Sequence, residues 1–98
     1  MYTIVDFCLI PLEAGLSLSP YIAQCQKIFT KHNLKIELHA YGTNIEGDWD
    51  TIMMAIKECH VEIHKMDVPR ISSTLKIGSR IDRQQSMAEK VQSVKDKI

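Results

Sequence analysis

Four stretches of the chain have the residue pattern of β-strands. Residues 2–11 are rich in β-branched and aromatic side chains, end at a proline, and carry apolar residues on both alternating faces. Residues 34–41 and 70–77 alternate between apolar and polar side chains, which is typical of a strand covered on one side only. Gly42 permits a tight turn, after which 43–46 are predicted to return as a short strand.

Three other stretches repeat apolar residues every three or four positions, the spacing of amphipathic helices. Each is preceded by a residue suited to cap the first turn of a helix. A proline follows the first cap, and a glutamate completes a capping box at the third. The predicted helices, each with its N-cap, are 19–33 (Ser19), 49–66 (Asp48) and 87–98 (Ser86).

The order of these elements predicts one domain over residues 1–98 with an α+β, ferredoxin-like fold, a split β-α-β sandwich followed by a C-terminal helix. Right-handed crossovers place the two long helices on one face of the sheet and leave the other face uncovered. Because the first strand is apolar on both sides, the uncovered face needs a cover from the third helix or from a second copy. We therefore expect sheets that pack together in an oligomer, a dimer or a dimer of dimers.

The charge balance and the cysteine spacing limit the kinds of partner and location that we expect. Twelve basic and twelve acidic side chains cancel, which argues against a nucleic-acid partner and against docking on an anionic membrane. No apolar run reaches the ~20 residues needed to span a bilayer, and the first residues lack the pattern of a signal peptide. The three cysteines have no CxxC spacing, which predicts small core residues and a reducing, cytoplasmic location.

The most informative stretch is Tyr41–Asp50, at the junction between the predicted hairpin and the second helix. It contains three acids, two aromatic residues and two glycines. An aromatic wall beside a carboxylate suits a flat, cationic heteroaromatic ligand. The alternative is structural: Trp49 anchors the helix to the core, while Glu46 and Asp48 complement the helix dipole.

Two further groups of polar residues are candidates for binding. His39, Tyr41, Thr74 and Lys76 are predicted on the uncovered sheet face, as pocket walls if a partner covers that face and as scattered solvated groups otherwise. Residues 76–83 place three cations around a Gly-Ser turn. That segment is an anion site, a subunit salt bridge or a solvated loop.

Catalytic and metal-binding motifs are not evident. His60 and His64 have the i, i+4 spacing of a helical metal site, but no third ligand is obvious, so we expect the polar edge of a helix and no metal. The chain has no phosphate-binding glycine loop, serine nucleophile elbow or carboxylate pair. Neither a cofactor nor an enzymatic activity is predicted.

The run Tyr41–Asp50 resembles the GT-x-IEG-x-WD motif of the small thiamine-binding-protein-like family, which is related to the YkoF-like proteins. Ile10-Pro11 and the glycine and serines after them are similar to the first loop of that family. Lys76-Ile77-x-x-Arg80-x-Asp82 is similar to its C-terminus, especially in fungal-type members. The resemblance covers essentially the whole chain. It implies a ferredoxin-like fold, tetramers built from two dimers with packed sheets, and, as in some bacterial relatives, binding of thiamine or its hydroxymethylpyrimidine part.

On this resemblance, the first hypothesis is a non-enzymatic cytoplasmic homotetramer that binds a small heteroaromatic ligand at a subunit interface. The expected roles are ring stacking by Trp49 or Tyr41, amine or thiazolium recognition by Glu46, orientation by Thr43 and Thr74, a pocket wall from His39, and a phosphate contact or tetramer lock from Lys76 and Arg80. A second hypothesis is a structural or regulatory interaction module without a ligand. A third is a cofactor-free enzyme with His39 as its catalytic candidate.

Overall fold

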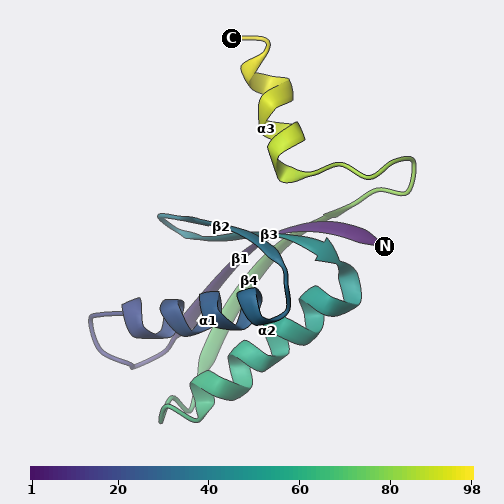
Figure 1. Ribbon diagram of the computed structural model, residues 1–98. Coiled ribbons are helices and arrows are strands. Elements are labelled where there is room, and N and C mark those ends of the chain that lie inside the picture. The colour runs from purple at the N-terminus through teal and green to yellow at the C-terminus, as the bar shows by residue number, and fades with distance from the viewer.

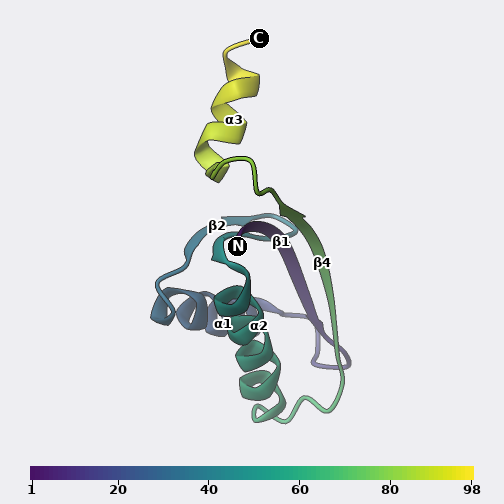
Figure 2. The ribbon, with the colours of Figure 1, turned by 90° about the vertical axis from the view of Figure 1, so that its right-hand side faces the viewer.

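The four strands form one antiparallel sheet in the order β2-β3-β1-β4, in a computed structural model that describes residues 1–98. Helices α1 and α2 lie on one face of this sheet, and α3 stands on the opposite side (Figures 1 and 2). This is the predicted ferredoxin-like arrangement with a C-terminal helix. In chain order the elements are β1 (Tyr2–Pro11), α1 (Ser19–Lys31), β2 (Lys35–His39), β3 (Gly42–Asp48), α2 (Trp49–His64), β4 (Ile71–Ser79) and α3 (Met87–Lys95).

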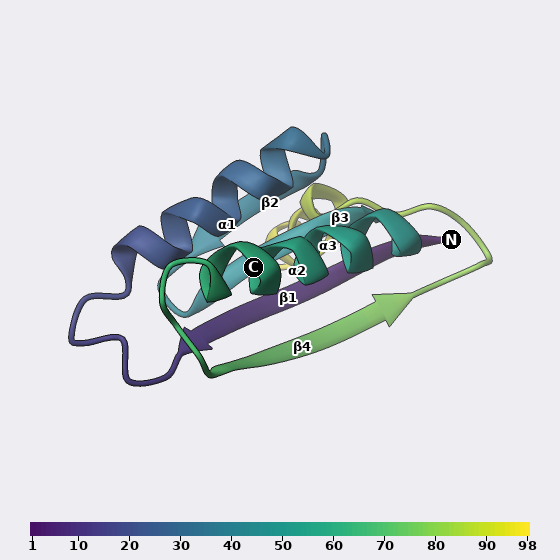
Figure 3. The same ribbon diagram turned by 90° about the horizontal axis from the view of Figure 1, so that it is seen from below.

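The core lies between the sheet and the pair α1 and α2. Seen from below, α1 runs over β2, and α2 runs over β1 and β3 (Figure 3). β1 is a central strand, as its two apolar faces predicted, and it turns Val5, Phe7 and Leu9 toward the helices. Phe7 meets Phe29 of α1 edge to face, with ring centroids 5.7 Å apart. Burying each large apolar side chain contributes roughly 1.5–3 kcal/mol, so this face of the sheet drives folding.

Two of the three cysteines belong to this core. Cys25 of α1 and Cys59 of α2 are buried, and Cys8 of β1 is half-buried, so the prediction of core or near-core cysteines is confirmed. A hydrogen bond with Cys25, together with burial, raises the pKa of the Cys59 thiol. Cys59 is therefore a packed, unreactive thiol.

The helix starts agree with the predicted caps in two of three cases. Asp48 accepts a hydrogen bond from the Asp50 amide at 3.1 Å, and Ser86 accepts one from the Glu89 amide at 3.1 Å. The prediction of Ser19 as the first cap was wrong by one residue. The N-cap is Leu18, whose carbonyl accepts from the amides one turn later, and no side chain caps this end.

Several predicted boundaries were also wrong: β2, α1 and α2 end earlier than predicted and β4 ends later, and larger differences occur at β3 and α3. β3 is a seven-residue strand and not the short 43–46, because β1 offers it a long partner, from Tyr2 opposite Asp48 to Phe7 opposite Thr43. α3 ends at Lys95 and not at Ile98, since the last turn has no packing partner to hold it.

The sheet face opposite α1 and α2 is mixed in character. β1 places Ile4, Asp6, Cys8 and Ile10 there, each at least partly exposed. α3 does not lie along this face: it projects away from the sheet and contains no buried residue (Figure 2). Most of the face is therefore open in a single chain.

Candidate functional site

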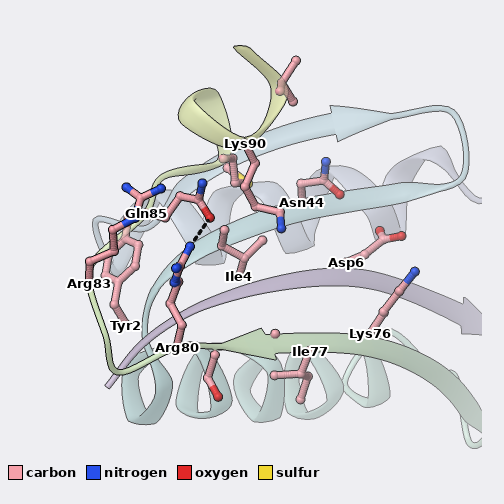
Figure 4. Close-up of a pocket in the computed structure, with 14 residues that line it drawn as sticks. Tyr2, Ile4, Asp6, Asn44, Lys76, Ile77, Arg80, Arg83, Gln85 and Lys90 are labelled. Carbon is pink, nitrogen blue, oxygen red and sulfur yellow. Dashed lines mark hydrogen bonds between the residues drawn. The ribbon is translucent and has the colours of Figure 1, made fainter. Parts of the chain in front are cut away.

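One cavity lies on the open sheet face, beneath the start of α3 (Figure 4). We call it the open-face pocket. Its volume is about 460 Å³. β1, β3, β4, the loop after β4 and α3 all contribute to it, so segments far apart in the sequence meet there. Its polar and charged side chains are Tyr2, Asp6, Asn44, Lys76, Ser79, Arg80, Arg83, Gln85 and Lys90, and its apolar ones include Ile4, Ile77, Met87 and Val91.

Cations dominate the open-face pocket. Lys76, Arg80, Arg83 and Lys90 line it, against Asp6 as the one acidic residue. The two guanidinium groups have partners: Arg80 donates from Nε to Asp82 at 2.7 Å and from Nη1 to Gln85 at 2.9 Å, and Arg83 lies 3.5 Å from Glu89. The Arg80 guanidinium lowers the pKa of the Asp82 carboxyl to about 2.

The two lysines of the open-face pocket differ from its arginines. Neither the Lys76 nor the Lys90 ammonium has an acidic group within 4 Å. Lys76 stands directly across the strand pair from Asp6, yet the Asp6 carboxylate bonds to the His39 ring at 2.9 Å. Lys90 reaches from α3 down toward Ile4 (Figure 4). Two ammonium groups without ion pairs therefore line one cavity.

Glu46 holds α3 at the edge of this pocket. The residue is 4% exposed, and its carboxylate accepts hydrogen bonds from the Tyr2 hydroxyl at 2.7 Å and from the Met87 amide, the first of α3, at 3.1 Å. Burial and the bond to Glu46 raise the pKa of Tyr2 to about 12. A carboxylate at the N-terminus of a helix also interacts favourably with the helix dipole.

The second cavity is an apolar groove between the start of α1, the loop before it and the β2–β3 hairpin. We call it the hairpin groove. It has a volume of about 1080 Å³, and 12 of its 19 lining residues are hydrophobic. Its rim is exposed and its floor is buried. The lining includes Leu16, Leu38, His39 and Tyr41 at the rim, with Phe7, Leu9, Gln26 and Thr43 deeper in.

One polar pair lies among the apolar walls of the hairpin groove. The Gln26 side-chain amide donates to the Thr43 hydroxyl oxygen at 2.9 Å. The Thr43 hydroxyl proton and the Gln26 carbonyl oxygen have no protein partner of their own. The groove therefore offers one donor and one acceptor side by side within an apolar surface.

Sequence comparison places the chain among known proteins. Residues 5–95 match the profile of the family described as Thiamine-binding protein. The chain belongs to this family. A UPF0045 protein of Synechocystis is 51% identical over 94 residues, which are 96% of this chain and 78% of that protein.

Solved structures of other proteins share the fold of this thiamine-binding protein family member. A hypothetical protein of Methanocaldococcus jannaschii is 36% identical and superposes with a TM-score of 0.89 over 97% of each chain. A proposed thiamine biosynthesis/salvage protein of Thermotoga maritima, 20% identical, superposes with a TM-score of 0.82 over 96% of this chain and 99% of that one. At this identity, the second similarity shows the fold alone.

The candidate residues that the sequence of this thiamine-binding protein family member suggested are divided between the two cavities. Lys76 and Arg80 line the open-face pocket, while His39, Tyr41 and Thr43 line the hairpin groove. Tyr41 is not on the open sheet face, because it lies in the turn between β2 and β3, where it is 87% exposed.

The other three candidates line neither cavity. The Glu46 carboxylate is hydrogen-bonded to the Tyr2 hydroxyl and the Met87 amide. Thr74 is exposed on the open face of β4, as predicted from the alternation of that strand. Trp49 begins α2, and its backbone amide donates to the Met1 carbonyl at 2.9 Å, which ties the helix start to the first strand.

Other residues of the cavities were not anticipated. Tyr2 shares a strand face with Ile4 and Asp6, and Gln26 lies four positions after Ile22 on α1, so strand and helix periodicity contain a signal for both. Lys90 and Gln85 are brought in by the path of the loop after β4, for which the sequence has no such signal.

The two histidines of α2 each bond to a protein group. His60 Nε2 lies 2.7 Å from the Ser73 hydroxyl, and His64 Nδ1 lies 2.7 Å from the Val68 carbonyl oxygen. Burial, and the nearby His64, lower the pKa of His60. No group of three or more His, Cys, Asp or Glu side chains is arranged to hold a metal ion. None of the three helices has the length and hydrophobicity to cross a bilayer.

Proposed function

We propose that this protein binds a small heteroaromatic ligand of the thiamine or hydroxymethylpyrimidine type in the hairpin groove, and that it catalyses no reaction on it. The observation that carries the proposal is the Gln26–Thr43 pair among apolar walls. Pockets for small ligands are mostly apolar, with a few polar groups that fix orientation. Membership of the thiamine-binding protein family supports the ligand class.

The polar pair matches an aminopyrimidine edge. Such a ring presents a nitrogen acceptor next to an amino donor. The Thr43 hydroxyl, whose oxygen already accepts from Gln26, donates to the ring nitrogen, and the Gln26 carbonyl oxygen accepts from the amino group. Tyr41 at the rim supplies an aromatic face for a cationic ring attached to the pyrimidine.

The surroundings of His39 support binding without catalysis. Its Nε2 is bonded to Asp6 at 2.9 Å, and its Nδ1 accepts from the Tyr41 amide at 3.3 Å. Both ring nitrogens are thus occupied, so the imidazole has no free site for taking a proton from a ligand. This weighs against the enzymatic hypothesis, in which His39 was the catalytic candidate.

We further propose that a second copy of the chain closes the site, within a dimer or a dimer-of-dimers tetramer. Leu16, Leu38 and Tyr41 expose apolar surface around the groove, and the apolar residues of β1 on the open face are only partly covered. Association removes such surface from water. Sedimentation velocity at increasing concentration tests this proposal, and a monomer at every concentration would overturn it.

Isothermal titration with thiamine and with hydroxymethylpyrimidine tests the ligand proposal. Thr43→Val keeps the side-chain shape and removes the donor, so hydroxymethylpyrimidine should bind about tenfold more weakly, equivalent to the ~1.4 kcal/mol of one hydrogen bond. Thr3→Val is the matched control: Thr3 is equally buried on the same sheet face but lines neither cavity. No heat with either ligand at millimolar concentration would leave the chain as an interaction module without a ligand. Equal affinity in the Thr43 variant and wild type would place any ligand elsewhere.

A further inference from the structure

We propose that the open-face pocket is an anion site, in which Lys76 and Lys90 bind the phosphate or diphosphate group of a small phosphorylated molecule. This site is separate from the hairpin groove, and the proposal does not depend on what binds there. The lysines come from β4 and α3, fourteen positions apart, and the fold brings them to one cavity (Figure 4).

The distribution of ion pairs identifies these two lysines. Acidic side chains are close, but each contacts another group: Asp82 pairs with Arg80, Glu89 with Arg83, and Asp6 with His39. Glu46 is buried beneath α3, bonded to Tyr2 and Met87. None of Asp82, Glu89 and Glu46 lines the pocket.

Two ammonium groups on one cavity repel each other unless an anion lies between them. A dianion bound between them replaces this repulsion with two favourable contacts. Lysine is a common phosphate ligand and acts as a flexible point charge.

The rest of the lining indicates an organic phosphate. A volume of about 460 Å³ leaves ample space beyond a single phosphate group. Asn44 and Gln85 provide neutral hydrogen-bonding groups, and Ile4 and Val91 provide apolar contacts. A small molecule with a phosphate or diphosphate at one end and an apolar or aromatic body satisfies both kinds of lining.

Titration calorimetry with inorganic pyrophosphate tests the site, using wild type and the double variant Lys76→Met, Lys90→Met. The substitutions keep an unbranched side chain that is one atom shorter and remove its charge. We expect wild type to bind pyrophosphate, with affinity that falls about tenfold between 50 and 500 mM NaCl because the contacts are ionic. The double variant should bind at least tenfold more weakly. Lys57→Met is the matched control, since Lys57 is an exposed lysine of α2 that has no ion pair and lines neither cavity. It should bind as wild type does.

The outcomes separate this proposal from the proposed function. Pyrophosphate binding that survives in Thr43→Val and is lost in the double lysine variant supports a separate anion site, whatever binds in the groove. No pyrophosphate heat in wild type, or equal affinity in the double variant, overturns the site even if thiamine binds. A short single-stranded oligonucleotide that competes with pyrophosphate, with the same dependence on both lysines, would assign the phosphate to nucleic acid and overturn the small-molecule class.

Discussion

Substitutions at Glu46 and Tyr2 test whether the hydrogen bond between Glu46 and Met87 fixes α3 to the sheet. α3 contains no buried residue, and the bond from the Met87 amide to Glu46 is the hydrogen bond that joins this helix to the sheet. Replacing Glu46 with alanine removes the acceptor for both Met87 and Tyr2. Replacing Tyr2 with phenylalanine removes one donor and keeps the carboxylate and its bond to α3.

We expect Glu46→Ala to lower Tm more than Tyr2→Phe does. A hydrogen bond to a charged group contributes about 1.5–3 kcal/mol, and the half-buried Tyr2 belongs near the lower value. At 4–8 °C per kcal/mol for a domain of up to about 100 residues, Tyr2→Phe should lower Tm by about 6–12 °C. Glu46→Ala loses two such bonds and should lower Tm by about 12–24 °C. Both variants should still fold, since total stability is typically ~5–15 kcal/mol.

Hydrogen exchange separates the two roles of Glu46. The amides of α3 should exchange faster in Glu46→Ala than in wild type, and close to the wild-type rate in Tyr2→Phe. Tyr41→Phe, at an exposed tyrosine, is the control for thermal unfolding and should leave Tm unchanged. Unchanged exchange of α3 in Glu46→Ala would refute the reasoning, because it would mean that the helix is held by other contacts.

The same contact predicts an alkaline pH dependence. The pKa of Tyr2 is raised in the folded protein, so folding favours the neutral phenol. The stability that this provides is fully present below the ordinary tyrosine pKa of ~10 and is lost as the pH rises through about 12. Urea unfolding between pH 9 and 11 should show a decline in wild type that is smaller in Tyr2→Phe. An identical decline in both proteins would assign it to other groups.

Three further predictions concern other parts of the molecule. Gly42→Ala should destabilise the protein by about 1–3 kcal/mol, since its Cβ would lie 2.6 Å from a backbone oxygen, whereas Gly78→Ala, with open space around it, should be nearly neutral in urea unfolding. Burial lowers the pKa of His60, so its contribution is present above the ordinary histidine pKa and lost as the pH falls. His60→Gln should therefore lose less stability than wild type between pH 7 and 5, and equal losses would contradict this. A thiol reagent should modify one cysteine, Cys8, in the native protein and all three after unfolding; three reactive native thiols would show that the core is open.

The alternation of side chains along β3 predicts the positions of the candidate residues better than the Tyr41–Asp50 motif does. Successive side chains of a strand alternate between faces, so Thr43 and Glu46, three positions apart in β3, lie on opposite faces of the sheet. Their closeness in the motif suggests that the two residues form one site. Their places in the strand separate them: Thr43 lines the hairpin groove, and Glu46 bonds to the start of α3. Lys76 and Thr74 share the open face for the same reason, and this part was predictable from alternation alone.

The position of α3 could not be derived from periodicity. Met87, Val91 and Val94 have the spacing of an amphipathic helix, which made this helix, beside a second copy of the chain, one of two candidates to cover the open face. The direction in which the chain leaves β4 decides where the helix stands, and the intervening loop is fixed by specific side-chain bonds of Arg80 to Asp82 and Gln85. Lys90 reaches the open-face pocket only through this loop, so its approach to Lys76 has no counterpart in the sequence pattern.

One side-chain pair, Asp6 with His39, bears on both proposed sites. Asp6 is the cross-strand neighbour of Lys76 and the acid best placed to pair with it, yet its carboxylate bonds to His39. This leaves the Lys76 ammonium available to an anion in the open-face pocket. Beside the hairpin groove, His39 Nε2 makes this bond, and its Nδ1 accepts from the Tyr41 amide. Neither ring nitrogen is then free to accept a proton from a ligand. A single pair thus favours anion binding on one side and the absence of general-base chemistry on the other. The pair therefore bears on both proposals, the anion site on the open face and ligand binding without catalysis in the hairpin groove.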